Sequence, residues 1–506
     1  MNVRLAIKRY LKTLLFWLYR HGCFKHSTWI YNLSADLFPF IIARTELNRG
    51  NINEPLQALT KSRYPRITKS KIYRRLDFMN QVLNSDFSYA PNTIEAKKSY
   101  NGQVLQVFHS CETYHQNGYA IRSRQIIQCL EESGTHTTNT TRLGYPWDFN
   151  QFAETEICTK SKPNMIEYLH RHDPQRLLID SDAVYIQKYS EYLTALIIEG
   201  NHTVIHAHSN FLNGIASSLA AEKANIPSIY EIRGLWHITR CSKDPEFKNS
   251  ELFQYQEKME IQAAAMSNIV ITLSGALKSW LISKGVSECK ISVVPNAADV
   301  TSDFIQSQHS DKFVIGYIGS ITEYEGLDLV LMAADKLRYK IDNLRVMIVG
   351  EGAYKKHLID LVKKLRLNNI VNFVGAVDHK DVPRYYAQMD VCPIFRKDYD
   401  VCKLVPPLKP LEIMSYGKAI IVSDLPPLTE IIEHKIDGLV CPNGNINNLA
   451  QQIMTLYNNK PFAIQLGEKA KNKIMSIYSW KKNAGIYINL YSGEQSPHSL
   501  LDIKEN

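Results

Sequence analysis

The chain has 506 residues, and because a single hydrophobic core stops growing at roughly 250–300 residues, two domains are expected. Hydrophobic residues make up 45% and charged residues 22%, which is typical of globular proteins, and no apolar run reaches the ~20 residues of a membrane-spanning helix. The net charge of +9 favours anionic partners. Nine cysteines without a C-x-x-C pair argue against a disulfide framework or a zinc site, and favour a cytoplasmic location.

Residues 1–100 are predicted to form an N-terminal helical and basic extension. No acidic residue precedes Asp36, and residues 1–20 place apolar side chains on one helical face and basic ones opposite. This pattern is typical of a helix that lies on an anionic surface, which would make the protein peripheral on the cytoplasmic face of an inner membrane. The alternative is a helix that packs on the protein itself.

Residues 101–300 show a βα alternation. Strands are expected at 104–108, 203–206, 228–232, 269–273 and 291–294, with helices after the first two of them. Strands that alternate with helices predict a mostly parallel sheet with helices on both faces.

The same alternation restarts after a polar spacer at 301–312, and the second domain is expected to span 301–478. Its strands are expected at 313–318, 344–349, 370–374, 391–394 and 418–422, and its helices include 327–337 and 408–416. Residues 479–506 are expected to form a return helix, which could pack on the first domain, and a tail. Two facing Rossmann-like doubly wound sheets would bind a ligand in the cleft between the carboxyl ends of their strands.

Four loops that follow expected strands contain glycine beside polar residues: Asn117-Gly118, Gly319-Ser320, Gly350-Glu351-Gly352 and Gly375. Glycine lets backbone N–H groups approach a phosphate, so the four loops together favour a nucleotide ligand. The alternative is that each glycine merely ends a strand. No P-loop and no G-x-G-x-x-G motif follows a strand, which disfavours triphosphatases and nicotinamide enzymes. The basic residues are dispersed beyond residue 75, which argues against nucleic acid as a partner.

Six short segments occur in an order that is specific when they are taken together. They are 205–208 (IHAH), 230–236 (YEIRGLW), 294–299 (VPNAAD), 316–328 (GYIGSITEYEGLD), 349–352 (VGEG) and 410–424 (PLEIMSYGKAIIVSD). They resemble the motifs of the retaining GT-B glycosyltransferases of family four, the group one transferases, and 230–236 resembles a bacterial polysaccharide branch. The resemblance covers about 102–491. It implies a nucleotide-sugar donor, a saccharide or lipid-linked acceptor, and a role in bacterial lipopolysaccharide, capsule or exopolysaccharide synthesis.

The resemblance also implies roles for individual residues. Glu412 would be catalytic and accept the ribose hydroxyls, and His208 would touch the donor sugar or act at the reacting centre. The remaining donor-binding positions are Asn117, Gly118, Arg233, Gly319, Ser320, Gly350, Gly352, Gly375 and Leu411. Glu412 could instead stabilise its own helix, His208 could be structural, and Arg233 could form an internal ion pair with Glu231.

Three positions depart from the family pattern. Leu404 stands where a glutamate is usual, and Ser320 and Glu325 replace the two basic residues that commonly face the donor diphosphate. Because a diphosphate needs positive charge or oriented amides, Arg396, Lys403 and Lys409 are candidate substitutes, with Arg396 and Lys409 preferred.

Enzymes of this type generally work without a metal or cofactor, and none is expected here. Asp180-Ser181-Asp182 has the letters of a D-x-D metal motif but fits a helix N-cap better. The losses at 320, 325 and 404 leave one rival hypothesis open. In it, the chain is an inactive homologue that serves as a scaffold of a polysaccharide assembly complex.

Overall fold

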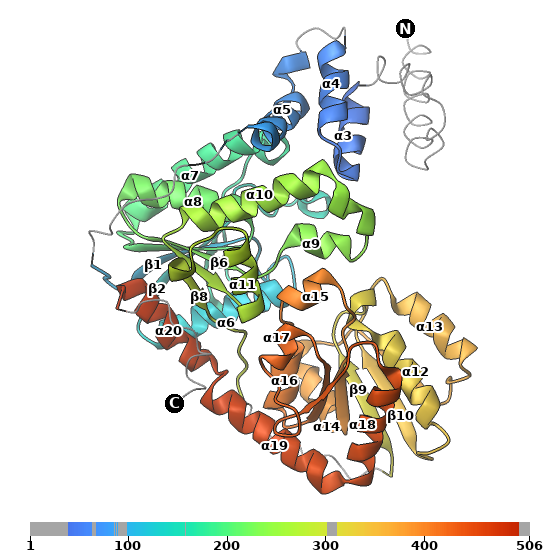
Figure 1. The fold of residues 1–506 in the computed structure, drawn as a ribbon. Helices are drawn as coiled ribbons and strands as arrows, with labels where there is room; N and C mark the ends of the chain where they lie inside the picture. Colours follow the sequence, from blue (N-terminus) through green and yellow to red (C-terminus); the bar gives the residue numbers. More distant parts are fainter. Residues whose placement is uncertain are drawn as a thin grey trace.

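The computed structural model describes residues 39–62, 67–85, 87, 89, 99–156, 158–300 and 311–494, and the structural statements below refer to these residues. The amphipathic segment at 1–20 lies outside them. Figure 1 shows two α/β units one above the other, with the N-terminal helices on the far side of the first unit. In the described part of the chain, no helix has both the length and the apolar character to cross a membrane.

The first unit contains an eight-stranded sheet in the order β3-β4-β2-β1-β5-β6-β7-β8. All of its neighbouring strands pair in parallel except β3 and β4. The strands are β1 (Gln103–Phe108), β2 (His136–Thr141), β3 (Lys160–Ser161), β4 (Tyr168–Leu169), β5 (Val204–His208), β6 (Ser228–Ile232), β7 (Ile269–Thr272) and β8 (Ile291–Val293). Strands β5 (VIHAH) and β6 (SIYEI) are buried along their whole length, although β5 carries two histidines and β6 a glutamate.

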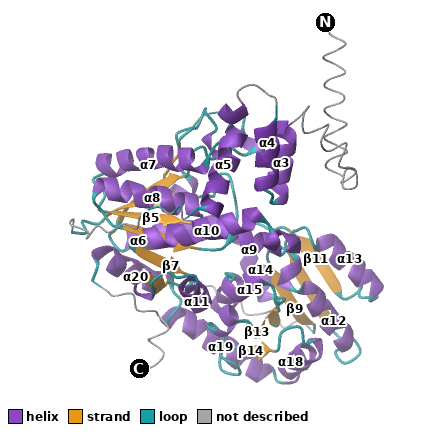
Figure 2. Cartoon of the chain, turned by 45° about the horizontal axis from the view of Figure 1, so that its top comes forward, coloured by secondary structure: helices purple, strands orange, loops and turns teal. Residues whose placement is uncertain are grey.

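Helices cover both faces of this sheet (Figures 1 and 2). They are α6 (Gly118–Glu132), α7 (Asp182–Glu199), α8 (Phe211–Ala224), α9 (Trp236–Cys241), α10 (Glu251–Met266) and α11 (Gly275–Ser283). Short 3-10 turns lie along the chain at η1 (Ile67–Lys69), η2 (Asn150–Phe152), η3 (Pro163–Met165), η4 (Leu177–Ile179), η5 (Pro245–Asn249), η6 (Glu288–Lys290), η7 (Glu323–Glu325) and η8 (His379–Asp381).

The N-terminal helices α3 (Pro39–Arg49), α4 (Asn53–Lys61) and α5 (Lys71–Asn84) pack against the first unit, where α5 contacts α7 and α10. Arg74 forms an ion pair with Asp180, and the Glu251 carboxylate accepts hydrogen bonds from the N–H groups of Ile52 and Asn53. Asp182 accepts a hydrogen bond from the Tyr255 hydroxyl at 2.7 Å. The carboxylates of Asp180 and Asp182, which match the D-x-D pattern, are therefore both bound by donors of the protein itself.

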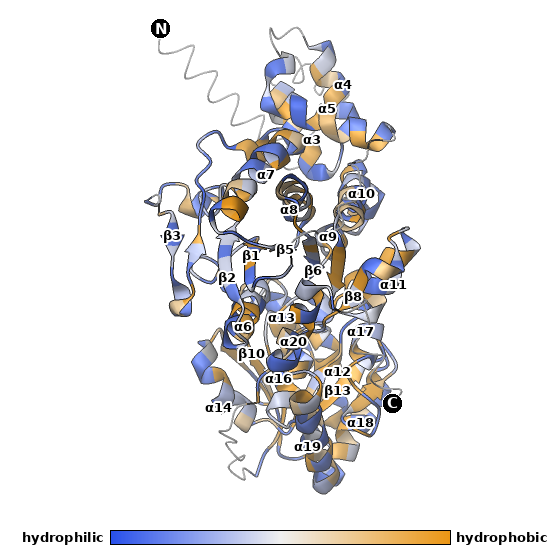
Figure 3. Cartoon of the chain, turned by 90° about the vertical axis from the view of Figure 1, so that its left-hand side faces the viewer, coloured by the Kyte–Doolittle hydropathy of each residue, from blue (hydrophilic) through white to orange (hydrophobic). Residues whose placement is uncertain are grey.

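The second unit contains a six-stranded parallel sheet in the order β11-β10-β9-β12-β13-β14. Its strands are β9 (Phe313–Ile318), β10 (Leu344–Val349), β11 (Val371–Gly375), β12 (Val391–Ile394), β13 (Ala419–Ser423) and β14 (Leu439–Cys441). Its helices are α12 (Leu327–Leu337), α13 (Lys355–Lys364), α14 (Val382–Ala387), α15 (Asp400–Leu404), α16 (Lys409–Ser415), α17 (Pro426–Thr429), α18 (Ile446–Asn458) and α19 (Lys460–Ser476). Figure 3 shows hydrophobic strands such as β13 among more hydrophilic outer helices.

The last described helix, α20 (Trp480–Ser492), returns to the first unit and packs against α6. It follows directly after α19, so the chain crosses from one unit to the other at this point (Figure 1). Its buried aromatic side chains Trp480, Tyr487 and Tyr491 join a core cluster that includes Val104 and Val204. The expected fold of two doubly wound units with an N-terminal helical region is therefore confirmed.

Candidate functional site

Loops that follow strands of the first sheet contact α15, α17 and the start of α16 in the second unit. The Ser274 hydroxyl donates to the carbonyl oxygen of Leu404 at 2.7 Å. The Glu430 carboxylate accepts hydrogen bonds from the N–H groups of Gly275 and Ala276, at 2.9 Å each, where α11 begins. The helix dipole favours an anion at that position. Leu404, where a glutamate was expected, thus contributes its backbone to the contact between the units.

Lys409 and Arg396 lie together around the buried carboxylate of Glu325. Lys409 Nζ lies 3.1 Å and Arg396 Nε 3.6 Å from Glu325 Oε1. Burial opposes ionisation of this carboxyl, but the charges of Lys409 and Arg396 prevail and lower the pKa of Glu325 below its ordinary value. The group therefore carries two positive charges against one negative charge. Lys403 pairs instead with Asp398 on the surface.

The Lys409 side chain lies across the loop that follows β9. A Cβ added at Gly319 would be 2.2 Å from Lys409 Cε, and the φ of Gly319 is +144°, so this position requires glycine. Ser320, the next residue, is exposed, and its carbonyl oxygen accepts a hydrogen bond from the Tyr317 hydroxyl. The loop thus presents Ser320 beside the cationic group.

The other glycine loops of the second unit pack closely against one another. A Cβ at Gly350 would be 2.0 Å from the carbonyl oxygen of Gly319, and one at Gly352 would be 2.1 Å from that of Ile321. These glycines therefore allow the backbones of neighbouring loops to approach, and their contact with a phosphate stays a prediction. Gly375 has a φ of +92° and is only partly buried.

Glu412 lies in the short helix α16, three residues after Lys409 and on the same side. Its side chain is partly exposed, and its Oε2 accepts a hydrogen bond from the Tyr386 hydroxyl at 3.4 Å. A partly exposed carboxylate one helical turn from Lys409 is well placed to accept hydroxyl groups of a ligand. Leu411 points the other way and is fully buried in the core.

Asn117 and Gly118 lie where α6 begins in the first unit. The Asn117 side chain accepts a hydrogen bond from the N–H of Ala120 and so caps the helix. Both residues are exposed, and a Cβ added at Gly118 would be 3.2 Å from Leu408 Cδ1 of the second unit. The helix therefore begins next to the residue that precedes Lys409. This juxtaposition brings the α6 dipole to the same region as the cationic group.

Arg233 is engaged inside the first unit. Its Nε donates to Glu231 Oε1 at 2.7 Å, its Nη1 donates to the Ser123 hydroxyl, and its side chain is 4% exposed. The alternative of an internal ion pair with Glu231 is thus confirmed. The expected contact of Arg233 with donor or acceptor has no support in this arrangement.

His208 lies within the same buried layer and has no exposed surface. Its Nδ1 lies 2.8 Å from Arg233 Nη2, its Nε2 lies 2.7 Å from Gln106 Oε1, and its ring stacks on Phe108 at 4.5 Å. Burial and the charge of Arg233 lower the pKa of His208 well below its ordinary value. The histidine is therefore neutral, and its geometry fits a structural role better than direct contact with the donor.

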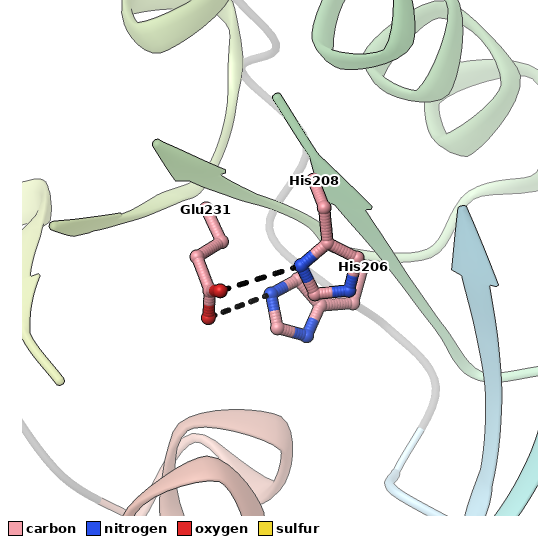
Figure 4. A group of neighbouring side chains, drawn as sticks. All are labelled: His206, His208 and Glu231. Carbon is pink, nitrogen blue, oxygen red and sulfur yellow. Dashed lines mark ion pairs between the residues drawn. The ribbon is translucent and has the colours of Figure 1, made fainter. Parts of the chain in front are cut away.

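Figure 4 shows His206, His208 and Glu231, whose possible ligand atoms lie within 4.8 Å of one another. The surrounding groups do not fit a metal ion. Glu231 Oε1 accepts hydrogen bonds from Arg122 Nε at 3.1 Å and from Arg233 Nε. Glu231 Oε2 accepts one from the Tyr487 hydroxyl at 2.6 Å. Burial opposes ionisation of Glu231, but the two arginines prevail and lower its pKa well below the ordinary value. A cation here would meet two guanidinium groups.

Arg122 is the residue of this network that sequence reasoning missed. It is 2% exposed and donates to the carbonyl oxygens of Val294 and Pro295 and to Asn296 Oδ1. Asn296 in turn donates to the carbonyl oxygen of Pro406 in the second unit. An arginine in an amphipathic helix normally indicates a solvated face, so the sequence carried no signal of this role.

Two family models match the chain, "Glycosyltransferase Family 4" over residues 150–302 and "Glycosyl transferases group 1" over 299–473. An uncharacterised glycosyltransferase of Methanocaldococcus jannaschii is 24% identical over 389 residues, which cover 74% of this chain and 94% of the relative. Anabaena HepE in complex with UDP superposes with a TM-score of 0.60 at 16% identity, over 77% of this chain and all of HepE. Sucrose-phosphate synthase of Thermosynechococcus elongatus superposes with a TM-score of 0.62 at 18% identity, over 78% of this chain and 98% of the synthase.

Proposed function

We propose that this chain, which matches the family 4 glycosyltransferase model over residues 150–302 and the group 1 model over 299–473, transfers a sugar from a nucleotide-sugar donor with retention of anomeric configuration. The single observation that supports the donor site best is the cationic group of Lys409 and Arg396 beside the Gly319 loop. Glu412 lies one helical turn from Lys409. In this proposal, the diphosphate of a nucleotide sugar binds at Lys409 and Arg396, and its ribose hydroxyls bind at Glu412.

The reaction separates a sugar with oxocarbenium character from a nucleoside diphosphate whose negative charge increases. Positive charge that is already in place stabilises that leaving group in the transition state, since it needs no reorganisation. Lys409 and Arg396 would supply this charge, and the start of α6 at Gly118 would add its dipole from the first unit. Retention requires the acceptor hydroxyl to attack from the face that the diphosphate leaves, so the enzyme must also position the acceptor.

Glu325 tunes this site in the proposal. Its carboxylate neutralises part of the charge of Lys409 and Arg396 when the donor is absent. With Glu325 ionised, the net charge of the three side chains is lower than that of Lys409 and Arg396 alone. Binding would depend on the guanidinium and ammonium groups turning their free donors towards the diphosphate.

The acceptor is proposed to be a saccharide or a lipid-linked saccharide of a bacterial surface polysaccharide. The resemblance of 230–236 to a polysaccharide branch supports this, and so does the basic amphipathic segment at 1–20. That segment would hold the protein on the cytoplasmic face of the membrane, where a lipid-linked acceptor is found. No metal or cofactor is part of the proposal.

The experiment is a turnover assay of the purified full chain with single sugar nucleotides of uridine, guanosine, adenosine and thymidine. We expect one of them to release its nucleoside diphosphate, slowly with water and faster when a saccharide acceptor is added. Proton NMR of the new linkage should show the anomeric configuration of the donor. Inversion would contradict the mechanism, and no release from any donor by a folded protein would favour the scaffold hypothesis.

A further inference from the structure

The chain between α15 and α16 is held by its backbone carbonyl oxygens. Residues 404–408 (LVPPL), the connector, lead from the last residue of α15 to the start of α16. Three successive carbonyl oxygens of the connector accept hydrogen bonds from side chains: Leu404 from the Ser274 hydroxyl at 2.7 Å, Val405 from Arg396 Nη1 at 3.0 Å, and Pro406 from Asn296 Nδ2 at 3.1 Å. Because two of its residues are prolines without an N–H group, the connector depends largely on its carbonyl oxygens for polar contacts.

The donor to Leu404 belongs to the first unit. Ser274 precedes α11 and is 1% exposed, and its hydroxyl oxygen accepts a hydrogen bond from the N–H of Leu277 and so caps that helix. A hydroxyl can accept and donate at the same time, so its proton is left for the carbonyl oxygen of Leu404. Helix α11 also contacts α15 (Figure 1). One serine thereby joins the start of a helix in the first unit to the end of a helix in the second.

The donor to Pro406 lies in the segment that joins the two units. Asn296 is 3% exposed, and its Oδ1 accepts a hydrogen bond from Arg122 Nη1 at 3.0 Å. A guanidinium group has only donors, so the amide oxygen of Asn296 must face Arg122, and the amide NH2 group must face Pro406. The buried arginine of α6 therefore fixes the orientation in which Asn296 holds the connector.

The connector in turn places both cations of the proposed diphosphate site. Arg396 Nη1 donates to the carbonyl oxygen of Val405, and Arg396 Nε lies 3.6 Å from Glu325 Oε1. Among the described residues, this Nε has no hydrogen-bond partner of good geometry. Lys409 follows the connector directly, as the first residue of α16. A displacement of the connector would therefore move the guanidinium and the ammonium group together.

From these contacts we infer that Ser274 and Asn296 are positioning residues of the diphosphate site. Each acts on Lys409 and Arg396 through a carbonyl oxygen of the connector, since chains of hydrogen bonds and packed groups carry energetic coupling between separate positions. The inference rests on the proposed donor site. It adds that the affinity for a diphosphate depends on a side chain of the first unit and on one of the segment between the units.

The test is isothermal titration of the full chain with UDP, GDP, ADP and dTDP, and then of variants with the nucleotide that binds most tightly. Asn296→Asp is isosteric and keeps an oxygen for Arg122, but it places a second carboxylate oxygen, instead of an NH2 group, against Pro406. It should weaken diphosphate binding about tenfold, which is within the range for substitutions that act through a network.

Ser274→Ala removes the other donor and should weaken diphosphate binding about fivefold. Ser274→Thr keeps the hydroxyl and should bind as the wild type does. The matched control is Ser283→Ala, which removes an exposed hydroxyl of α11 that donates to the carbonyl oxygen of Trp280, and it should change nothing. Variants are titrated when their circular dichroism matches that of the wild type, and the Ser274 series tests the inference alone if Asn296→Asp does not fold.

A double-mutant cycle shows whether the effect acts through the cations. In a Lys409→Ala background, Asn296→Asp should weaken binding only about threefold, because one of the two cations that it places is gone. An equal loss in both backgrounds would show that Asn296 serves only the local structure, and would overturn the inference. An equal loss in Ser274→Ala and Ser274→Thr would do the same for Ser274.

Failure of the proposed function gives a different result. If Lys409→Ala weakens binding while Asn296→Asp and Ser274→Ala bind as the wild type does, the donor site stands and the positioning roles are overturned. If the wild type binds none of the four nucleotides, the proposed donor site fails and the inference fails with it.

Discussion

Lys409 Nζ lies 3.1 Å from Oε1 of Glu325. Glu325 stands at a position where the family that the chain resembles commonly has a basic residue. The positive charge of the site therefore comes from α16 and from Arg396, and the residue at 325 has the opposite sign. An exchange of this kind leaves net positive charge near the Gly319 loop. It would supply the proposed donor site with positive charge although two of the family's usual cations are replaced.

This pair predicts opposite effects of two substitutions on diphosphate affinity. Lys409→Ala removes a cation and should weaken binding of a nucleoside diphosphate by about 10–100-fold, since hydrogen bonds to charged groups contribute about 1.5–3 kcal/mol. Glu325→Gln removes the competing carboxylate and should tighten binding. Isothermal titration measures both, with Lys403→Ala, on the surface near Asp398, as the control. A weaker affinity in both variants would mean that the pair serves only the local structure.

Glu412→Ala should weaken the binding of a nucleoside as well as of its diphosphate. Its carboxylate is partly exposed beside Tyr386 and is proposed to accept the ribose hydroxyls, so losing it costs about 1.5–3 kcal/mol of binding. Glu468→Ala, an exposed acidic position on α19, is the control. An unchanged nucleoside affinity in a folded Glu412→Ala protein would assign the carboxylate to its own helix instead.

Glu231→Gln should destabilise the first unit strongly, by about 3–5 kcal/mol, because Arg122 and Arg233 would remain buried without their counter-charge. The pKa of Glu231 is lowered on folding, so its contribution is present above the ordinary carboxyl pKa and is lost as the pH falls through the folded value. Urea unfolding between neutral and acidic pH measures this. The variant should show a flatter acid dependence, and an equally stable variant would contradict the network.

Much of the fold could be predicted from the sequence because buried parallel strands form apolar runs. Strands β6, β9, β10 and β12 occur at the expected residues. Strand β2, with the sequence HTTNTT, was missed because its residues are polar and carry no apolar pattern. Pairing with β1 and β4 makes it a strand, and such long-range pairing cannot be found by local periodicity.

The candidate site was only partly predictable. Lys409, in the expected helix 408–416, and Arg396 were predicted to serve one diphosphate together, but the carboxylate between them depends on how η7 folds back towards α16. The burial of His208 and Arg233 could not be found from their positions at strand ends. It depends on the Glu231 carboxylate of β6, which pairs with both side chains and also binds Arg122 of α6.

The contact of Glu430 with α11 predicts that Glu430→Ala loosens the two units. Two N–H groups at the start of the helix would lose their acceptor, at a cost of about 1–2 kcal/mol. Small-angle scattering should show a larger radius of gyration, and thermal unfolding a lower midpoint. Glu433→Ala, an exposed neighbour, should match the wild type. Identical scattering from all three proteins would show that this contact does not hold the units together.

A donor site that binds a nucleotide sugar through Lys409 and Glu412 should raise the thermal midpoint when the ligand is present. The most direct measurement is the thermal midpoint of the wild type, Lys409→Ala and Glu412→Ala proteins with a panel of sugar nucleotides and nucleoside diphosphates, beginning with UDP, the ligand of HepE. A ligand that binds only the folded protein raises its midpoint. We predict a rise in the wild type with one base, and little or none in the two variants. The absence of a rise with any nucleotide, or an equal rise in all three proteins, would contradict the account.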